Sequence, residues 1–253
     1  MVRLLVSASR RQPAARAWIN RRPETHLPVI AFISPKGGAG KTTAALVLAL
    51  GLVEQGRRVA MIDSDPNKPL VEWSTLPNPP DGLTIHPAPT AQDIADAQRD
   101  ARRHDPDWII LDTEGSVRGA MAFTTLRPDL ALTPLAGSQL EATQAIKAAE
   151  MVREFGRRGG RALPHRCLLT RIPAAIRPRS LEAVVEQLKQ HQIEFLPTAL
   201  LEKEAFRAMF RIGGGFAGLE AAGVGGVAAA RRNAEAYVEA VLALLGQGGV
   251  QAA

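Results

Sequence analysis

Two lysines and three glycines stand close together in the segment that reads SPKGGAGKTT, residues 34–43. Glycine lets the backbone turn tightly enough for successive N–H groups to face phosphate oxygens, and a helix N-terminus adds partial positive charge. Lys41 could reach the β- and γ-phosphates of a nucleotide, and the Thr42 hydroxyl could bind Mg²⁺. The segment therefore predicts a phosphate-binding loop whose cradle comprises Lys36, Gly37, Gly38, Ala39, Gly40, Lys41, Thr42 and Thr43.

The segments on either side of this loop predict the elements that would position it. Residues 28–33 form a short, apolar, β-rich run, and residues 42–56 have helical spacing. This strand, loop and helix order is the context that a P-loop requires. The general pattern GxxxxGK[ST] is not met, because its first position falls on Pro35. The alternative interpretation is a glycine-rich turn without a ligand.

A second candidate lies at residues 59–67, where an apolar strand ends in Asp63 and Asp65. A carboxylate at such a position could hold a water in line with a γ-phosphate. The alternative is a solvated turn whose acidic side chains cap a helix. The preceding phosphate loop favours the chemical interpretation.

A third candidate lies at residues 107–115, where an apolar strand delivers Asp112 at its carboxyl end. This pattern is similar to a Walker B strand. Open parallel sheets bind ligands outside the carboxyl ends of their strands, so Asp112 is expected near the waters of a bound Mg²⁺.

The spacing KGGxGKTT is that of a deviant Walker A motif, and with it the chain resembles the ParA/MinD superfamily of P-loop ATPases. The resemblance implies ATP and Mg²⁺ as ligands. It implies that Lys36 reaches the partner's nucleotide across a dimer, and that Asp65 positions or deprotonates the attacking water. The catalytic residues would then be Lys36, Lys41 and Asp65, and the metal-site residues Thr42, Asp63 and Asp112. Many relatives read Asp-Thr-Pro where this chain has Glu114.

In such relatives, the nucleotide base is held by the loop after a later strand, here residues 166–171, and by a further loop. By resemblance to these relatives, Thr170, Arg171 and Pro173 are expected to contact the base, although the asparagine that is typical of the relatives is missing here. Within the superfamily, residues 65–73 and 204–209 are similar to VirC-type ATPases that assist T-DNA transfer. The resemblance covers about residues 28–245 and does not specify a cargo.

Length and composition agree with one enzyme-sized domain. The chain has 253 residues, of which 46% are hydrophobic and 22% charged. No apolar run approaches the roughly 18 residues that cross a bilayer, so we expect a soluble protein. The only cysteine, Cys167, excludes an internal disulfide and is expected in a buried strand.

The positive charge is concentrated near the N-terminus, and we expect the chain to have three parts. Residues 1–27 carry six arginines against Glu24, which accounts for +5 of the net charge of +6. We expect a basic N-terminal extension at 1–27, a P-loop ATPase domain at 28–246 and a small, neutral tail at 247–253. The extension is expected to be flexible. Contact with DNA or a membrane, a transit-peptide-like role, or an upstream start codon remain alternatives.

Strand and helix patterns alternate along the domain, which predicts an α/β fold with a mostly parallel twisted sheet and helices on both faces. The glycines at 213–226 are interpreted as a flexible connection to a final helix. Strands are expected near 28–33, 59–63, 83–86, 107–112, 130–134, 166–171 and 195–198, and helices near 42–56, 91–103, 138–155, 180–190 and 227–245.

The resemblance implies a cytoplasmic, nucleoid-associated ATPase that forms a homodimer with ATP and binds DNA without sequence preference. It would partition or position a plasmid or other cargo, with a ParB-like or other activating partner. The chain end lacks a basic amphipathic helix, so no stable membrane anchor is expected. Candidate DNA contacts are Arg171, Arg177, Arg179, Arg207, Arg211, Arg231 and Arg232.

Other function classes share this type of P-loop. A nitrogenase-reductase-like electron carrier needs two cluster-binding cysteines, so Cys167 alone excludes it. A bacterial tyrosine kinase carries a tyrosine-rich tail, whereas Tyr237 is the only tyrosine. An ATPase that positions a chemoreceptor cluster or a cellulose-synthesis complex remains an alternative. So does a metabolic ligase of the dethiobiotin-synthetase type.

Overall fold

The computed structural model describes residues 26–35, 38–90, 92–113, 117–173 and 179–248. Its centre is a seven-stranded sheet in the order β3-β2-β4-β1-β5-β6-β7, with every neighbouring pair parallel. The predicted α/β class and parallel sheet are confirmed. The strands are β1 Val29–Phe32, β2 Val59–Asp63, β3 Leu83–Pro87, β4 Trp108–Asp112, β5 Leu130–Leu135, β6 His165–Ile172 and β7 Phe195–Leu201.

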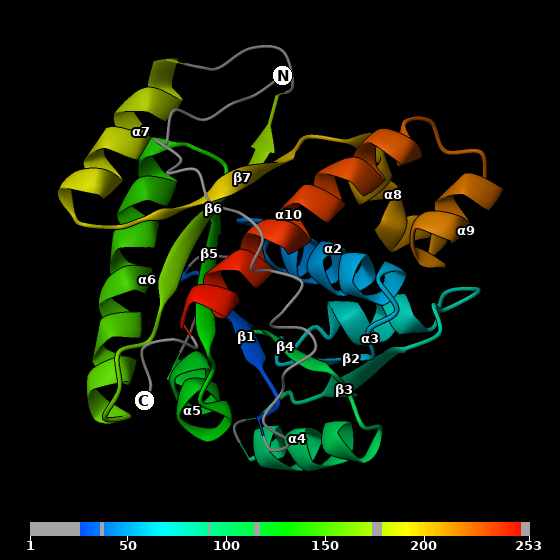
Figure 1. Ribbon diagram of the computed structural model, residues 1–253, viewed down its shortest axis with the longest axis horizontal. Helices are drawn as coiled ribbons and strands as arrows, with labels where there is room; N and C mark the ends of the chain where they lie inside the picture. The colour runs from blue at the N-terminus through cyan, green and yellow to red at the C-terminus, as the bar shows by residue number, and fades with distance from the viewer. Residues whose placement is uncertain (1–25, 36–37, 91, 114–116, 174–178, 249–253) are drawn as a thin grey trace.

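Helices cover both faces of this sheet, as the alternating pattern predicts (Figure 1). The sequence patterns did not predict the short helices α3, α8 and α9, nor α5. The helices are α2 Lys41–Glu54, α3 Pro69–Ser74, α4 Asp93–Arg103, α5 Val117–Leu126, α6 Gln139–Arg158, α7 Arg179–Gln190, α8 Glu204–Ile212, α9 Gly215–Ala221 and α10 Val227–Gly248.

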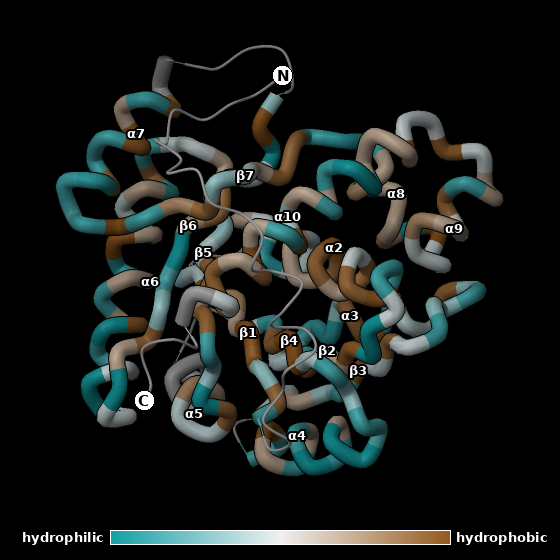
Figure 2. Tube along the Cα trace, viewed as in Figure 1, coloured by the Kyte–Doolittle hydropathy of each residue, from teal (hydrophilic) through white to brown (hydrophobic). Residues whose placement is uncertain are grey.

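The two faces of the sheet build separate cores because strand side chains alternate between faces. Ile30 and Phe32 face a core shared with α2, α3, α8, α9 and α10. Ala31 faces the other side, where α4, α5 and α6 pack, and α7 adds a cluster beside β6. Figure 2 shows α2 as a largely hydrophobic helix in the middle of the molecule. Its residues 44–52 are buried, which explains why it carries no polar face.

Helix α6 begins at the residue that its capping pattern predicts. The Ser138 hydroxyl accepts a hydrogen bond from the Glu141 N–H, and the Glu141 carboxylate accepts one from the Ser138 N–H. This capping box satisfies two N–H groups that the helix leaves without an internal partner. It fixes the start of α6 above the carboxyl end of β5.

The glycine-rich segment before α10 is ordered by packing, so the expectation of a flexible connection is wrong. Residues 215–221 form α9, which buries Phe216 and Leu219 in the core. Gly213 ends α8 with φ 77° and ψ −165°, a conformation that only glycine adopts readily. A Cβ at Gly213 would lie 2.6 Å from the Leu76 Cβ and 3.0 Å from the Pro77 oxygen.

Replacing Gly213 with alanine is therefore expected to lower the free energy of unfolding by about 3 kcal/mol, from backbone strain plus steric overlap. Gly223→Ala is the matched control, because Gly223 also has positive φ (70°), but no atom of the described residues beyond its chain neighbours lies within 4 Å of the place that a Cβ would occupy there. We expect the control to lose only about 1 kcal/mol. Urea denaturation of both variants measures the difference; equal losses would contradict the packing argument.

The last helix, α10, lies across the face of the sheet that carries α2 (Figure 1). Within the described ranges, no helix is both long and apolar enough to cross a membrane. Cys167 is fully buried in β6, as expected, and burial raises the pKa of its thiol to about 12. The predicted extension at 1–27 lies almost wholly outside the described residues.

Candidate nucleotide-binding site

The parallel register brings the three sequence motifs to one edge of the sheet. Phe32 at the end of β1 pairs with Asp112 at the end of β4, and Asp63 at the end of β2 pairs with the same Asp112. β1 lies between β4 and β5, so the strand order reverses direction at this point of the sheet. Such a switch point is where open α/β sheets bind ligands.

The loop after β1 presents the N-terminus of α2 to this edge. Gly38 and Gly40 both have φ 84°, and Gly40 is the left-handed N-cap of α2. Among the described residues, no side chain caps the helix, and no acidic residue lies in its first turn. Its N–H groups and the charge of Lys41 are therefore available to an anion. Lys36 and Gly37 lie outside the described residues.

Asp112 provides a buried carboxyl group beside the phosphate loop. Its side chain is 1% exposed, and neither carboxylate oxygen has a hydrogen-bond partner among the described residues. Burial raises the pKa of Asp112 to about 7, whereas the nearby Thr42 hydroxyl and the Lys41 charge act to lower it. A buried carboxylate without a partner is costly, and carboxylate and hydroxyl oxygens suit Mg²⁺. Thr42 and Asp112 therefore fit the predicted metal site.

Asp63 has a different environment, although it is also buried. One of its oxygens accepts a hydrogen bond from the Asp65 N–H at 3.2 Å. The other accepts from the N–H groups of Leu70 at 2.9 Å and Val71 at 3.2 Å. Burial raises the pKa of Asp63, and these hydrogen bonds act against that rise. Asp63 thus caps α3 and fixes the loop between β2 and α3, while its role toward Mg²⁺ stays a prediction.

Asp65 lies at the start of the loop between β2 and α3 and is partly exposed. Its Oδ1 accepts hydrogen bonds from the Asn67 N–H at 2.9 Å and the Asn67 side-chain amide at 3.1 Å. This is an Asx turn, which orients the carboxylate without burying it. Its catalytic role stays a prediction.

Two hydroxyl residues that were not identified from the sequence motifs connect the carboxyl ends of neighbouring strands by hydrogen bonds. The Ser64 N–H and hydroxyl both donate to the Asp112 carbonyl oxygen at 3.0 Å. The Thr113 hydroxyl donates to the Phe32 carbonyl oxygen at 2.6 Å. Both lie directly after strand-ending aspartates, which is the one sequence signal that could have indicated them.

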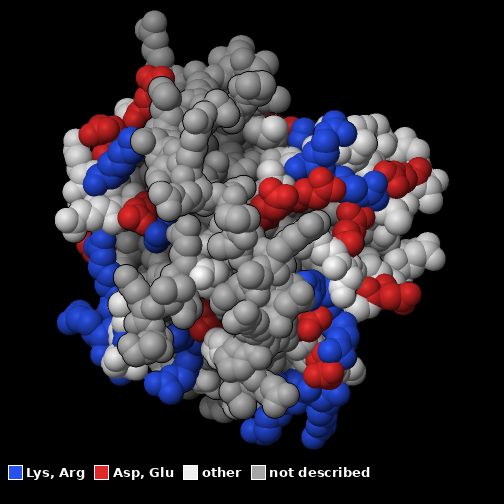
Figure 3. All heavy atoms as spheres, viewed as in Figure 1, with Lys and Arg blue, Asp and Glu red and all other residues white. Residues whose placement is uncertain are grey.

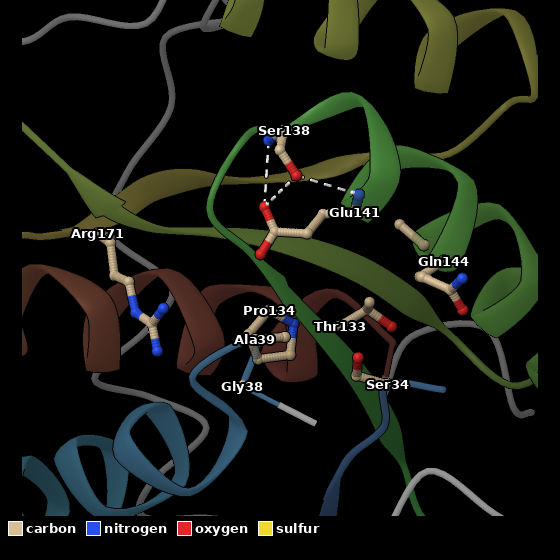
Figure 4. Close-up of a pocket in the computed structure, with 10 residues that line it drawn as sticks. Ser34, Gly38, Ala39, Thr133, Pro134, Ser138, Glu141, Gln144 and Arg171 are labelled. Atoms are coloured by element: carbon tan, nitrogen blue, oxygen red, sulfur yellow. Dashed lines mark hydrogen bonds between the residues drawn. The ribbon is translucent and has the colours of Figure 1, made fainter. Parts of the chain in front are cut away.

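A cavity of about 310 Å³ lies between the phosphate loop and the start of α6. Figure 4 shows Arg171 and Gln144 on opposite sides of it, with the Ser138–Glu141 capping box above Ala39 and Pro134. The loop and α6 belong to neighbouring strands, β1 and β5. The cavity is lined by Ser34, Gly38, Ala39, Thr133, Pro134, Ser138, Glu141, Gln144, Ala145 and Arg171.

A second cavity, of about 460 Å³, opens on the other side of the P-loop helix. Thr170 and Arg171 line it, whereas Pro173 is not among its lining residues and is exposed. Their role as base contacts stays a prediction. Arg171 has φ 54°, a strained conformation for a residue with a side chain. A wall formed by β7 and α8 was not predicted from the sequence. That wall comprises Leu200, Leu201, Glu202, Lys203, Phe206, Arg207 and Phe210.

Thr170 also positions the phosphate loop, because its buried hydroxyl donates to the Ala39 carbonyl oxygen at 3.3 Å. Replacing Thr170 with valine keeps the shape but removes this hydrogen bond, so we expect about 1 kcal/mol less stability and several-fold weaker ATP binding. Thr143→Val is the control, since among the described residues the exposed Thr143 hydroxyl donates only to the Gln139 carbonyl oxygen of the same helix. Calorimetric titration with ATP measures the effect; unchanged affinity would contradict this role.

Comparison with known proteins agrees with this geometry. A model of the VirC1 protein family matches residues 27–245. Protein ParA of Rhizobium radiobacter is 30% identical over 217 residues, which cover 85% of this chain and 96% of the relative. Protein virC1 of Rhizobium rhizogenes is 29% identical and covers 72% of this chain and 80% of the relative.

Among solved structures, the fold is similar to a putative plasmid partition protein of Borrelia burgdorferi B31 bound to AMPPNP. The TM-score is 0.63 at 18% identity, covering 87% of this chain and all of that one, so the similarity establishes the fold. The family match extends over the phosphate loop, the two aspartate-ended strands and the wall formed by β7 and α8. The chain belongs to the VirC1 protein family, within the ParA/MinD superfamily of P-loop ATPases.

Proposed function

We propose that this protein is an ATPase that forms a homodimer with ATP, binds DNA without sequence preference and partitions or positions a plasmid or other cargo. The observation that carries the ATP-binding part of the proposal is the meeting of a helix N-terminus without a side-chain cap and the buried carboxylate of Asp112, whose oxygens have no hydrogen-bond partner at normal distance among the described residues. The first suits a phosphate chain and the second suits a metal ion beside it. The ParA and virC1 relatives support the same class of activity.

The chain's own groups have distinct parts in this proposal. The N–H groups at the start of α2 and the Lys41 ammonium would bind the phosphates. Thr42 and Asp112 would hold Mg²⁺, which neutralises charge on the phosphate oxygens when bound. Asp65 would hold the attacking water and accept its proton, since its Asx turn orients the carboxylate in the loop between β2 and α3.

The second cavity is the proposed site of the nucleotide base. Phe206 and Phe210 line it four residues apart on α8, and Thr170 and Gly40 connect it to the phosphate loop. An apolar wall with a few polar groups at its rim is typical of a base-binding pocket. The proposal places the base against residues from the ends of β6 and β7.

The dimer is proposed to form over the nucleotide, with Lys36 of each subunit contacting the phosphates bound by the other. Lys36 lies outside the described residues, so this role is carried over from the resemblance. The cavity of about 310 Å³ lies beside the loop that contains it. Loss of the γ-phosphate would remove that contact and favour separation of the subunits.

Ion pairs with acidic side chains reduce the number of candidate arginines that are free to contact DNA. Arg207 pairs with Glu202 and Glu204, and Arg231 pairs with Glu54 and Glu220, so both are locally neutralised. Figure 3 shows basic and acidic side chains intermixed over the corner that α8, α9 and α10 occupy in Figure 1. Arg171, Arg211 and Arg232 form no ion pair with the described residues. Arg177 and the Arg179 side chain lie outside them.

DNA binding should therefore depend on ATP and on salt. If three phosphates are neutralised per protomer, the slope of log affinity against log salt is about −2.7 per protomer. We would measure binding to unrelated duplexes by fluorescence anisotropy with ATP, ADP and no nucleotide. Arg211→Ala with Arg232→Ala should reduce the slope, whereas binding that ignores the nucleotide, or no binding at all, would contradict the DNA role. Turnover that requires a small carboxylate substrate would instead favour a metabolic ligase.

A further inference from the structure

A second cluster of metal-ligating side chains lies at the β3 edge of the sheet, among residues of β3 and α4 that the proposed function does not use. It consists of His86 on β3, Asp100 on α4 and His104 directly after α4. One ligand atom from each lies within 4.8 Å of the other two. Asp100 and His104 are four residues apart, a spacing that places two side chains on one side of a helical turn.

His86 is held in a fixed orientation, unlike the other two residues. Its side chain is 5% exposed, whereas Asp100 and His104 are exposed. Its Nδ1 lies 2.8 Å from Asp100 Oδ2, and its Nε2 lies 2.9 Å from the Thr84 hydroxyl. The His104 ring lies 5.4 Å from the His86 ring, centroid to centroid. The buried His86 side chain is thus fixed at the edge of the sheet, and the exposed Asp100 and His104 side chains lie beside it.

We propose that His86, Asp100 and His104 form a binding site for one divalent transition-metal ion of the Zn²⁺ class. The ligands would be Nδ1 of His86, one carboxylate oxygen of Asp100 and one ring nitrogen of His104, with water in the fourth position.

The donor set matches the chemistry of such ions. Two imidazoles and a carboxylate are ordinary ligands of Zn²⁺, whereas Mg²⁺ prefers oxygen alone. Ligand atoms about 2.0–2.1 Å from a tetrahedral ion lie about 3.3 Å apart, so the exposed Asp100 and His104 side chains need only small rotations. The carboxyl end of α4 adds the negative end of a helix dipole. Arg103, 3.7 Å from Asp100, would compete for that carboxylate.

Each ring nitrogen of His86 has a polar partner, because Nδ1 lies beside Asp100 Oδ2 and Nε2 lies beside the Thr84 hydroxyl. In the metal-free protein Nδ1–H can donate to Asp100. With a metal on Nδ1 the ring proton moves to Nε2 and donates to Thr84 Oγ1, so Thr84 would act as a positioning residue.

Metal binding would join the edge strand to the helix that covers it. His86 pairs in register with Ile62 of β2, one residue before Asp63, and the Ala88 N–H donates to the Asp63 carbonyl oxygen at 2.7 Å. The site is therefore separate from the phosphate loop but lies next to β2, the strand that ends at Asp63. A bound ion would stabilise this edge against opening.

The test is a titration of the full chain, with any purification tag removed, using Zn²⁺ in calorimetry and Co²⁺ in visible absorption. The titration contains excess Mg²⁺, which occupies sites that offer oxygen ligands alone, and no nucleotide, because ADP itself binds Zn²⁺ and Co²⁺. We expect one ion per chain, a tetrahedral Co²⁺ spectrum and a higher melting temperature with Zn²⁺. His104→Ala and Asp100→Asn change exposed side chains and should each weaken binding at least tenfold. Exposed His191→Ala is the matched control and should bind like the wild type.

Thr84→Val provides a second measurement, because it leaves all three ligands in place. Loss of the hydrogen bond that orients His86 should weaken Zn²⁺ binding by about 10- to 100-fold. The absence of stoichiometric binding would overturn the proposal, as would an affinity that His104→Ala leaves unchanged. An octahedral Co²⁺ spectrum would also overturn it.

Discussion

Replacing Asp65 with alanine is expected to reduce ATP hydrolysis by about 10²- to 10⁴-fold while ATP-dependent dimerisation persists. The expected loss is that of a group which positions or deprotonates the attacking water. The phosphate loop, Thr42 and Asp112 remain in this variant, so ATP binding should be retained. Steady-state phosphate release, together with light scattering of the ATP-bound protein, measures both effects. A variant that stays monomeric with ATP would contradict the proposed cycle.

Asp65→Asn separates this chemical role from a structural one. An asparagine at this position can still accept the hydrogen bonds that Asn67 donates, so the Asx turn is kept. It lacks the negative charge that a proton acceptor needs. We expect hydrolysis to fall about as far as in Asp65→Ala. Full activity in Asp65→Asn would show that only the turn matters.

Replacing Lys41 with alanine is expected to weaken ATP binding by about 10- to 150-fold and to abolish hydrolysis. A hydrogen bond to a charged group contributes about 1.5–3 kcal/mol, and Lys41 is the first residue of the helix that faces the phosphates. Lys41 forms no ion pair with described residues, but its charge acts to lower the pKa of the buried Asp112 carboxyl, so the melting temperature without nucleotide should fall at neutral pH. Calorimetric titration with ATP measures the binding.

Lys189→Ala is the matched control for that experiment. Lys189 lies in the last turn of α7, is exposed and does not line either cavity near the phosphate loop. The substitution removes the same charge from the chain and should leave ATP affinity unchanged. Equal losses in Lys41→Ala and Lys189→Ala would mean that net charge, and not a specific phosphate contact, controls the affinity.

The parts of the fold that were predictable are those in which local pattern and tertiary packing agree. Apolar runs such as residues 59–63 became buried parallel strands, and Ser138 with Glu141 predicted the start of α6. The position of Asp112 beside the phosphate loop followed from the rule that parallel strands end at one edge. Each of these signals is contained in fewer than about ten consecutive residues.

The parts that were missed depend on contacts between distant segments. Gly213 looks like a flexible glycine in sequence, but its contact with Leu76 and Pro77 explains why no larger residue fits there. The cavity wall formed by β7 and α8 was missed because α8 is short and its few turns give little periodic signal. The capping role of Asp63 becomes visible only when Pro69 is known to start a helix.

The central claim is that the γ-phosphate converts this protein from a monomer to a DNA-binding dimer. Sedimentation velocity of the full chain with Mg²⁺ and no nucleotide, ADP or the non-hydrolysable analogue AMPPNP tests it most directly. We predict a monomer without nucleotide and with ADP, and a dimer with AMPPNP that Lys41→Ala does not form. The same association state under all three conditions would contradict the claim.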